Sequence, residues 1–336
     1  MVKNKKALII LIAVLAVLPL INQSKPVHNA IILLLIFASL GEAWNLITGF
    51  AGQTSFGHAA FFGIGAYTSA VIFSRYGITP WAGVILGGIL ASAAAAVISY
   101  PCFRLKGHYF AIATLAAAEI VKQIFVSWKY VEGATGISLP IIARSSGFGK
   151  RLFYLQFNDK LPWVYICLVI FAAVIFFCSY LENSKMGYYL KAIRESHEVA
   201  ESIGINTTNY KLYVMVISAF ISAVCGSIYA QYILYIDPFM IFSLDISMKI
   251  VLLTVLGGVG NIFGPIIGAA VFILLSEFTR IQLGGSGTGI DLMIYGLLIV
   301  LITCFQPKGV IGIIARVSNR LKQQKRGGEG NAEAAS

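Results

Sequence analysis

Six ionisable side chains within or at the ends of long apolar runs of this sequence are candidates for a functional role. They are Glu42, His58, Glu119, Lys122, Asp245 and Glu277. A charge inside a membrane is costly, so such residues are usually paired or functional. Glu119 and Lys122 are three residues apart, and this spacing lets a carboxylate and an amine pair on one helix. Asp245 and Glu277 lie near the ends of their apolar runs, where their side chains can reach water.

A polar segment framed by glycines, residues 49–58, is the strongest candidate for a binding site. Non-helical backbone at membrane depth persists only where it faces protein or a watery cavity, and broken helices bring such segments to substrates. The glycine cluster at 257–265 has a similar composition. Either segment can instead form a tight loop at the membrane edge. The predicted translocation pathway comprises Glu42, Asn45, Gln53, Thr54, Ser55, His58 and Asn261.

Motifs for catalysis or cofactor binding are absent from the sequence. It has no G-x-x-x-x-G-K-[ST] phosphate loop, no H-E-x-x-H and no G-x-S-x-G, so ATP would have to be hydrolysed by another chain. His58 has no His or Cys partner at ligand spacing, and none of the five cysteines forms a C-x-x-C pair. We therefore predict no enzyme activity, no metal site and no cofactor.

The elements that position these residues are membrane-spanning helices. Hydrophobic residues make up 58% of the 336-residue chain and charged residues only 12%, and the mean hydropathy is +0.83. Such a chain needs a bilayer as solvent. We predict an all-α integral membrane protein, a bundle of about ten transmembrane helices (8–10). The predicted apolar runs are 7–21, 30–47, 58–73, 81–100, 109–126, 162–181, 212–236, 246–256, 266–278 and 290–305.

The net charge of +11 gathers in short segments between the apolar runs, which indicates membrane orientation and not nucleic-acid binding. The positive-inside rule places both termini in the cytoplasm and the loop 127–161 outside. If the divided stretch 246–278 is re-entrant, this parity fails. Residues 1–317 form the predicted membrane domain, and the polar tail 318–336 is predicted to be disordered. Stripes of small residues at 59–70 and 83–87 predict close helix packing.

One long charged segment between two strong spans, residues 182–211, has the pattern of an amphipathic helix of about five turns. Tyr189, Ile193, Ala200 and Ile203 share its apolar face, and Gly204 suits a left-handed C-terminal cap. Its acidic and basic residues balance in number, whereas a helix adsorbed to anionic lipid is usually basic. The pattern therefore favours docking on a protein partner over lying on the membrane surface.

This segment also carries a family resemblance. GYYLKAIRESHEVAESIGIN, residues 187–206, resembles the cytoplasmic loop of permeases that import branched-chain amino acids, of the LivM type. Residues 45–70 and 210–230 resemble that family's N-terminal signature and the span after the loop. The glycine-rich segment 257–269 and FQPKGVIG at 305–312 are similar to two further family motifs. The resemblance therefore spans nearly the whole chain.

The resemblance implies the architecture of an ABC importer in a bacterial inner membrane. The loop, about residues 186–204, would be a coupling helix seated on an ATPase subunit. The partners would be a second related permease, two ATPase subunits and a periplasmic or lipid-anchored binding protein that delivers the substrate. The predicted coupling residues are Gly187, Ala192, Arg194, Glu195, Glu198, Ala200 and Gly204.

The substrate and the energy source leave alternatives open. Branched-chain amino acids are the expected substrates, and related permeases import urea, short amides or other amino acids. A proton-coupled secondary transporter is the rival from another class. It would need a buried carboxylate relay, for which the sequence offers Glu42, Glu119 and Glu277. Such a carrier has no use for a helix that docks on an ATPase.

Overall fold

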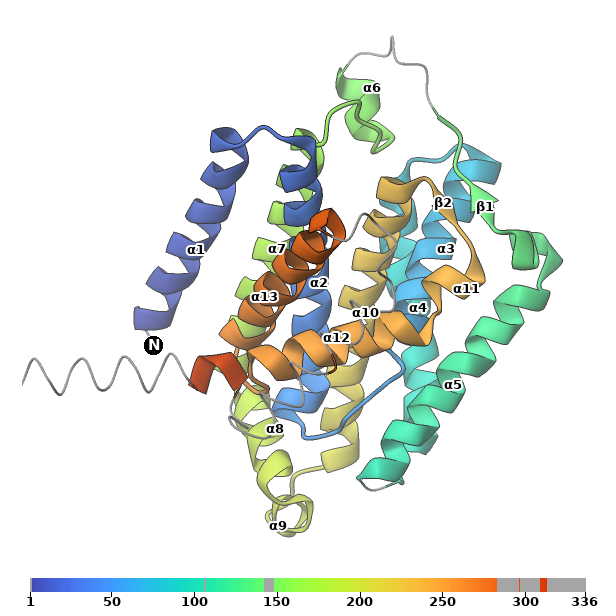
Figure 1. Ribbon diagram of the computed structural model, residues 1–336. Helices are drawn as coiled ribbons and strands as arrows, with labels where there is room; N and C mark the ends of the chain where they lie inside the picture. The colour runs from blue at the N-terminus through green and yellow to red at the C-terminus, as the bar shows by residue number, and fades with distance from the viewer. Residues whose placement is uncertain (1, 106, 142–147, 283–295, 297–308, 313–336) are drawn as a thin grey trace, which may run out of the picture.

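The computed structural model describes residues 2–105, 107–141, 148–282, 296 and 309–312. Within these residues the fold is helical apart from one antiparallel pairing of two short strands (Figure 1). Every apolar run predicted before residue 283 contains a helix, although the last residues of the run 212–236 form strand β2. The predicted run 290–305 and the predicted tail 318–336 lie outside the described residues, so the total of about ten spans stays a prediction.

Six described segments are long and apolar enough to cross a membrane, and two further apolar helices are shorter. Pro26, Pro80 and Pro162 stand in the first turns of three helices, where the fixed φ of proline suits helix entry. The long helices are α1 (Val2–Ile21), α2 (Lys25–Asn45), α3 (His58–Tyr76), α4 (Pro80–Cys102), α5 (His108–Ser127), α7 (Leu161–Glu182), α10 (Thr207–Ile233), α12 (Leu244–Gly257) and α13 (Phe263–Gln282).

The shorter elements connect these helices. A π-helical turn, η1, directly continues α2. The loop after α5 contains two 3-10 turns, strand β1 and α6, and β1 pairs with β2 after α10. The short elements are η1 (Leu46–Phe50), η2 (Lys129–Val131), η3 (Gly133–Thr135), β1 (Ile137–Ser138), α6 (Phe148–Phe153), α8 (Lys185–Glu195), α9 (His197–Ser202), β2 (Tyr235–Ile236) and α11 (Pro238–Ile241).

The long helices from α1 to α10 run alternately between two ends of the bundle (Figure 1). The α8 end carries α8, α9 and the segment 51–57. The β2 end carries α6 and the β1–β2 pairing. The predicted external loop 127–161 and the predicted coupling segment 186–204 thus lie at opposite ends, as a spanning bundle requires. Which end faces the cytoplasm stays a prediction.

Helices α3, α4 and α10 pack against one another, and Gly83 and Gly87 of the predicted stripes lie at this contact, whereas Gly63 faces Phe242. Side-chain to backbone hydrogen bonds cross this contact: Ser227 Oγ donates to the Gly65 carbonyl at 2.8 Å, and Ser92 Oγ donates to the Val216 carbonyl at 3.2 Å. Helix backbones must come close for such short side chains to reach across. Small residues therefore allow these helices to pack closely, as the sequence pattern indicated.

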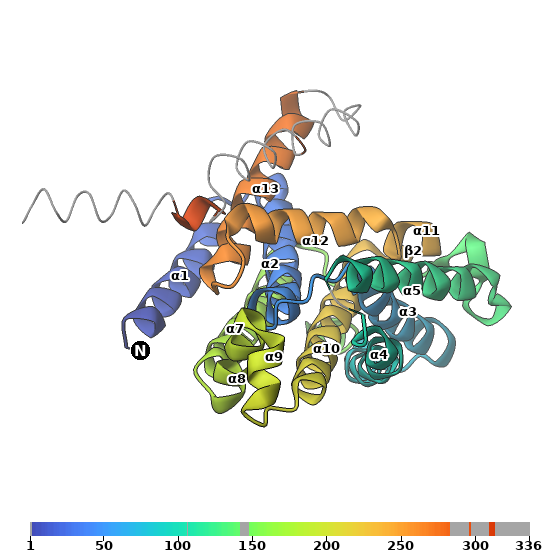
Figure 2. The same cartoon turned by 90° about the horizontal axis from the view of Figure 1, so that it is seen from below.

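The divided stretch forms two separate helices. The 14 residues of α12 rise only about 21 Å, less than the roughly 30 Å hydrocarbon core. Helix α11 extends the stretch toward the β2 end, and a turn at 258–262 reverses the chain into α13. Seen from below in Figure 2, α12 lies across one side of the bundle, with α7, α8 and α4 on the other side.

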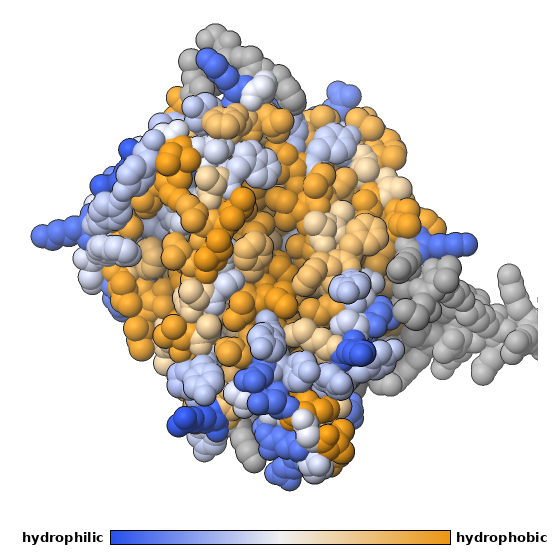
Figure 3. Space-filling view, turned by 180° about the vertical axis from the view of Figure 1, so that it is seen from behind, coloured by the Kyte–Doolittle hydropathy of each residue, from blue (hydrophilic) through white to orange (hydrophobic). Residues whose placement is uncertain are grey.

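The two sides differ in surface chemistry. Figure 3 shows the face opposite α12, where a broad apolar band has polar residues gathered above and below it. On α4, Ile89 and Val97 expose 54% and 75% of their surface. An unbroken apolar band of this kind suits contact with lipid tails.

Candidate functional site

Four segments that lie far apart in the sequence meet at the α8 end of the bundle. They are η1 with the loop that follows it, α8, the turn 258–262 between α12 and α13, and the segment 309–312. Gly309 lies against the backbone of Gly257 and Gly258. These segments belong to the motifs that carry the family resemblance, so the motifs form one spatial cluster.

Arg194 of α8 holds this cluster together. Its guanidinium Nη1 donates to the Gly49 carbonyl at 2.6 Å, a charge-assisted bond across 145 residues of sequence. The carbonyl belongs to the last turn of η1, where helix carbonyls lack an intrahelical donor and are available to an outside one. The predicted coupling residue therefore contacts the permease itself, although its side chain is exposed.

The turn 258–262, which follows α12, also lies close to the Arg194 guanidinium. Gly260 has a φ of +82°, and a β-carbon there would lie 2.4 Å from Arg194 Nη1. The Gly260 N–H donates to Asn45 Oδ1 at 2.8 Å, and Asn45 Nδ2 donates to the Asn261 carbonyl at 3.2 Å. A β-carbon on Gly49 would lie only 2.0 Å from Asn45 Oδ1, which is too close for the two atoms to coexist. Gly49 is required by close approach, since a β-carbon there would also lie 2.7 Å from the Gly260 backbone nitrogen, whereas Gly260 is favoured by its positive φ. Two predicted pathway residues, Asn45 and Asn261, hold the turn.

The predicted five-turn helix is wrong in one respect, because α8 and α9 are two helices. Ser196 adopts an extended conformation, with φ −158° and ψ 116°, and its Oγ accepts from the Val199 N–H at 3.4 Å. Serine favours such capping, which competes with a continuous helix. Gly204 follows α9 with a φ of +86°, which confirms the predicted left-handed cap, whereas Ile203 is 69% exposed and lies off the buried face.

Several contacts tie α8 to the spans beside it. Lys191 forms an ion pair with Glu182 at 2.9 Å at the end of α7, and its amine lies 6.0 Å from the centre of the Phe50 ring of η1. Tyr189 packs edge-on against Tyr210 of α10, with ring centroids 5.1 Å apart. A displacement of α8 would thus act on α7, α10 and η1 together.

The remaining predicted coupling residues divide into a buried and an exposed group. Gly187 and Ala200 are buried and Ala192 is half-buried, so these three pack α8 and α9 onto the bundle. Glu195 and Glu198 are exposed.

Two exposed apolar residues were missed by the sequence reasoning. Tyr188 and Val199 expose 63% and 60% of their surface on α8 and α9. The amphipathic pattern had placed the apolar face elsewhere, and the break at Ser196 rotates α9 relative to α8. With Ile203 and the exposed acids they form a mixed surface that we call the α8–α9 surface.

His58 and Ser55, predicted for the pathway, are buried and take part in links between helices. His58 Nε2 lies 2.8 Å from Ser218 Oγ of α10. The Ser55 carbonyl accepts from Trp44 Nε1 at 2.7 Å, and the Ser55 hydroxyl accepts from the Gly57 N–H at 3.2 Å. These bonds anchor the loop between η1 and α3, which matches the tight-loop alternative for these two residues.

Gln53 and Thr54 are half-buried in the same loop, which passes between α5 and α12. The Phe56 N–H donates to Thr114 Oγ1 of α5 at 3.1 Å, and Ser247 Oγ of α12 donates to the Phe56 carbonyl at 2.8 Å. The accessible part of the predicted pathway segment therefore lies at the α8 end of the face formed by α5 and α12.

Glu42 is fully buried on α2, and neither carboxylate oxygen has a hydrogen-bond partner among the described residues. The predicted pair on α5 forms as expected, with Lys122 Nζ 3.1 Å from Glu119 Oε1. Gln123 Nε2 also donates to this oxygen at 3.0 Å. Glu42 thus has no hydrogen-bonded connection to Glu119 in the part of the chain that the structure describes.

The pair on α5 lies on an exposed helix face. Glu119 and Gln123 are exposed, as is the neighbouring Ile120. Lys249 of α12 is half-buried, and the described residues provide no ion pair for it. The sequence reasoning passed over Lys249, although a lysine inside the divided apolar stretch was the available signal. Charges here contrast with the apolar band on the opposite side (Figure 3).

The described residues contain no cluster of three His, Cys, Asp or Glu side chains that could hold a metal ion. Four cysteines fall among them, and each is a free thiol. The fifth cysteine of the sequence, Cys304, lies outside the described residues.

Comparison with known proteins gives a consistent result. A family model described as "Branched-chain amino acid transport system / permease component" matches residues 27–303. The chain is 26% identical to the high-affinity branched-chain amino acid transport system permease protein LivM of Escherichia coli (strain K12), covering 92% of this chain and 75% of LivM. It is 28% identical to LivH of Salmonella typhimurium, covering 84% and 94%, and 25% identical to BraD of Pseudomonas aeruginosa, covering 82% and 91%.

Proposed function

The chain belongs to the family of branched-chain amino acid transport permeases, and we propose that it is the membrane-spanning subunit of an ATP-driven importer of leucine, isoleucine and valine. It is a multi-pass membrane protein and a transport component, not an enzyme. Its proposed partners are a second related permease, two ATPase subunits, a binding protein outside the membrane, and membrane lipid.

The main structural support for this proposal is the hydrogen bond from Arg194 to the Gly49 carbonyl. In the proposed mechanism, ATP binding closes the ATPase pair and displaces α8 and α9. The displacement passes through Arg194 to η1 and the 258–262 turn, and through the Lys191–Glu182 pair to α7. Rigid elements linked in this way can repack as a unit, which changes the side of the membrane to which the pathway opens.

We place the docking site of the ATPase on the α8–α9 surface. Exposed aromatic and aliphatic side chains within a polar rim are typical of protein interfaces. Tyr188 and Val199 supply the apolar centre, and the exposed Glu195 and Glu198 supply part of the rim. Arg194 then links the docked α8–α9 surface to the helix bundle through its bond to Gly49.

We place the second permease against the face of α5 and α12. Glu119 and Gln123 on α5 would meet lipid if this face were uncovered, at a substantial cost in free energy. A protein partner, with a watery pathway between the two permeases, removes that cost. Gln53 and Thr54 then lie at the α8 end of this pathway, which retains part of the pathway predicted from the sequence.

Reconstitution tests the function. Proteoliposomes would hold the chain with its second permease and ATPase subunits, with the binding protein and labelled leucine outside and ATP inside. We expect ATP-dependent uptake that isoleucine and valine inhibit and urea does not. Substituting the phosphate-loop lysine of the ATPase should abolish it. Uptake that follows a proton gradient without ATP would instead support the secondary transporter.

Cross-linking tests the position of the second permease. Ile120→Cys on α5 and Val97→Cys on α4 form a matched pair, since these side chains expose 62% and 75% of their surface. In a background without the native cysteines, we expect only I120C to form a cross-link to the second permease. A cross-link from V97C alone would place the partner on the opposite side.

A further inference from the structure

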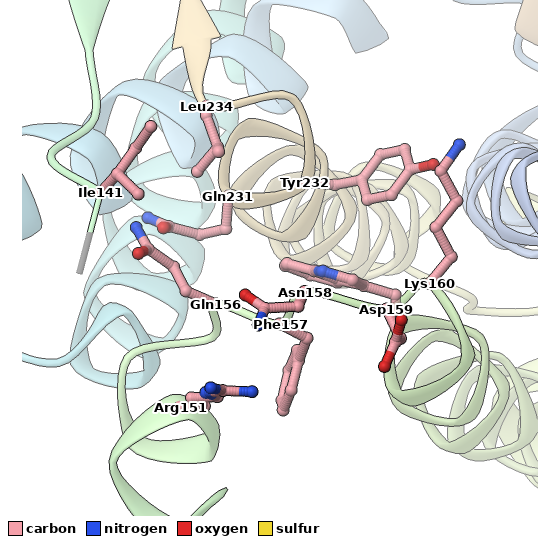
Figure 4. Close-up of a pocket in the computed structure, with 11 residues that line it drawn as sticks. Ile141, Arg151, Gln156, Phe157, Asn158, Asp159, Lys160, Gln231, Tyr232 and Leu234 are labelled. Carbon is pink, nitrogen blue, oxygen red and sulfur yellow. The ribbon is translucent and has the colours of Figure 1, made fainter. Parts of the chain in front are cut away.

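Two hollows of the molecule have similar volumes but opposite chemistry. Figure 4 shows a polar pocket of about 310 Å³ at the β2 end, whose lining includes Lys160, Gln231 and Trp163. The other hollow is a groove of about 360 Å³ between the middle parts of α7 and α10. Its lining is entirely apolar and includes Ile170, Ala173 and Phe177 of α7 with Ile217, Phe220 and Val224 of α10.

The groove exists because α7 and α10 both pack on α2 and have little contact with each other. Val174 and Ile221 are buried at 7% and 6% exposure and form its floor. One wall is fixed by α4, since a β-carbon on Gly88 would lie only 2.4 Å from the Phe220 ring. Neighbouring helices therefore hold the walls of the groove in place.

The groove opens toward the lipid-facing side of the bundle. Helix α7 lies on the side away from α12 (Figure 2), and the face opposite α12 carries the apolar band (Figure 3). Phe177 and Phe220 expose 42% and 39% of their surface at the groove. The second permease, which we place against α5 and α12, leaves this side open to the bilayer.

The lining favours a lipid chain over a helix of another protein. Helices that associate within a membrane meet through small residues and polar side chains. Among the described lining residues Ala173 is the small one, and none is polar. A flexible acyl chain can instead follow the aliphatic and aromatic walls and gain dispersion contacts along them.

Two tyrosines lie at the α8 end of the groove. Tyr180 follows Phe177 by three residues on α7, and Tyr213 precedes Ile217 by four residues on α10. These spacings place both tyrosines on the helix faces that line the groove. They expose 74% and 58% of their surface. Tyrosine favours the level of the lipid headgroups, where its hydroxyl meets polar groups and its ring meets apolar ones.

The length of the groove matches one leaflet. The rise from Tyr180 to Ile170 on α7 and from Tyr213 to Val224 on α10 is about 15–17 Å, at roughly 1.5 Å per residue. The hydrocarbon core is about 30 Å thick, so each leaflet contributes about half of that length. An acyl chain whose headgroup lies at the tyrosines would therefore reach the far end of the groove.

We infer that this groove binds one acyl chain of a phospholipid from the leaflet at the α8 end, whose phosphate accepts hydrogen bonds from Tyr180 and Tyr213. Both helices also contact α8, through the Lys191–Glu182 pair on α7 and through Tyr210 on α10. The bound chain thus fills the space between two spans that the coupling segment contacts. The site depends on the fold and not on the transported solute.

Photolabelling tests the site in the complex of permeases and ATPases. The complex is reconstituted in vesicles of phosphatidylethanolamine and phosphatidylglycerol with a trace of phosphatidylglycerol that carries a diazirine in one acyl chain. Adducts are mapped by mass spectrometry, and the exposed face of α4 around Ile89 and Val97 serves as the reference. We expect residues 170–177 and 217–224 to carry about threefold to tenfold more label than this reference, as one or two hydrogen bonds in a membrane would give.

Variants separate the groove from its mouth. Ala173→Phe should fill the groove and reduce the label on 217–224 to the level of the α4 reference. Ala93→Phe is the matched control, because Ala93 is also an exposed alanine and lies on α4 outside the groove. The double variant Y180F/Y213F keeps both rings, removes both hydroxyls and should lower the enrichment by about threefold or more.

Three results would overturn the inference. They are equal label on the groove segments and on α4 in the wild-type complex, label in A173F and Y180F/Y213F that stays at the wild-type level, or equal losses in A173F and A93F. Label on α4 with none on 170–177 and 217–224 would show that protein covers the groove, which also contradicts a lipid chain there. Because the labelling needs no transport, ATP-driven uptake measured on the same vesicles tests the proposed function separately.

Discussion

The α8 end of the bundle and the pocket at the β2 end are both polar, but different kinds of contact hold them together. At the α8 end, Arg194 reaches a backbone carbonyl beside a turn in which a β-carbon on Gly260 would displace the guanidinium. At the β2 end, Lys160 and Tyr232 meet at one side-chain oxygen around an open pocket. Backbone contacts transmit displacement and tolerate little change, whereas side-chain contacts adapt. We therefore expect substitutions to have their largest effects at the α8 end.

The largest effect is expected for Gly260→Ala. Its left-handed φ costs a non-glycine residue about 1–2 kcal/mol. The new methyl group must also displace the Arg194 guanidinium, which lies 2.4 Å from the β-carbon position. The cost of the φ lowers the stability of the folded protein, whereas the displacement breaks the charged hydrogen bond to Gly49, a kind of bond typically worth about 1.5–3 kcal/mol. Because about 1.4 kcal/mol is a factor of ten, ATP-driven uptake should fall by about tenfold or more.

Gly77→Ala is the matched control for this change. Gly77 has a similar φ of +64°, but a β-carbon there would have nothing within 4 Å. Uptake by this variant should remain within about twofold of wild type, since only the backbone cost applies. Equal losses in both variants would show that conformation alone is responsible and would remove the argument for a special contact at the α8 end.

Arg194→Ala ranks second. Removal of a charged hydrogen bond typically costs about 1.5–3 kcal/mol, although water can replace part of it at a half-exposed site. We expect ATP hydrolysis to continue while the leucine transported per ATP falls by about fivefold to tenfold. Lys185→Ala removes an exposed cation of α8 that lies outside this link and should leave the ratio unchanged. An unchanged ratio in R194A would contradict the coupling role.

These variants address a contact that the sequence could not predict. Apolar runs located the helices, because burial and lipid contact impose their pattern locally, and the spacing of Glu119 and Lys122 predicted their pairing. The meeting of Arg194 with Gly49 depends on how distant segments pack, which no local pattern encodes.

Two further features escaped prediction for different reasons. The break at Ser196 was missed because the amphipathic period continues across it, while the serine hydroxyl caps a new helix. Gln231 stands as a polar residue within the apolar run 212–236, and its isolation was the available signal for the pocket. Composition identified the class of protein, and tertiary contacts determined its sites.

Tyr188→Ala ranks third and tests the outward side of the α8 end. Loss of one exposed aromatic anchor at an interface typically costs about 1–2 kcal/mol of binding. We expect weaker retention of the ATPase subunits during purification and roughly threefold to tenfold lower uptake. Tyr100→Ala is matched in residue type and similar in exposure, with 53% against 63%, and lies at the end of α4. Stronger dissociation in Y100A would move the docking surface from α8 to α4.

The smallest effect is expected for Tyr130→Phe at the β2 end. The Tyr130 and Tyr76 hydroxyls lie 2.8 Å apart on an exposed surface, and Arg75 lies 4.6 Å above the Tyr130 ring. The hydrogen bond with Tyr76 raises the pKa of Tyr130. A raised folded-state pKa means that this contact stabilises the protein at neutral pH and is lost as the pH rises above about 10. Any difference in melting temperature between Y130F and wild type should therefore be small at pH 7 and vanish in alkali, with uptake unchanged at pH 7. A loss of uptake comparable to that of R194A would show that the β2 end is as intolerant as the α8 end, and the contrast between backbone and side-chain contacts would no longer explain where this permease is sensitive.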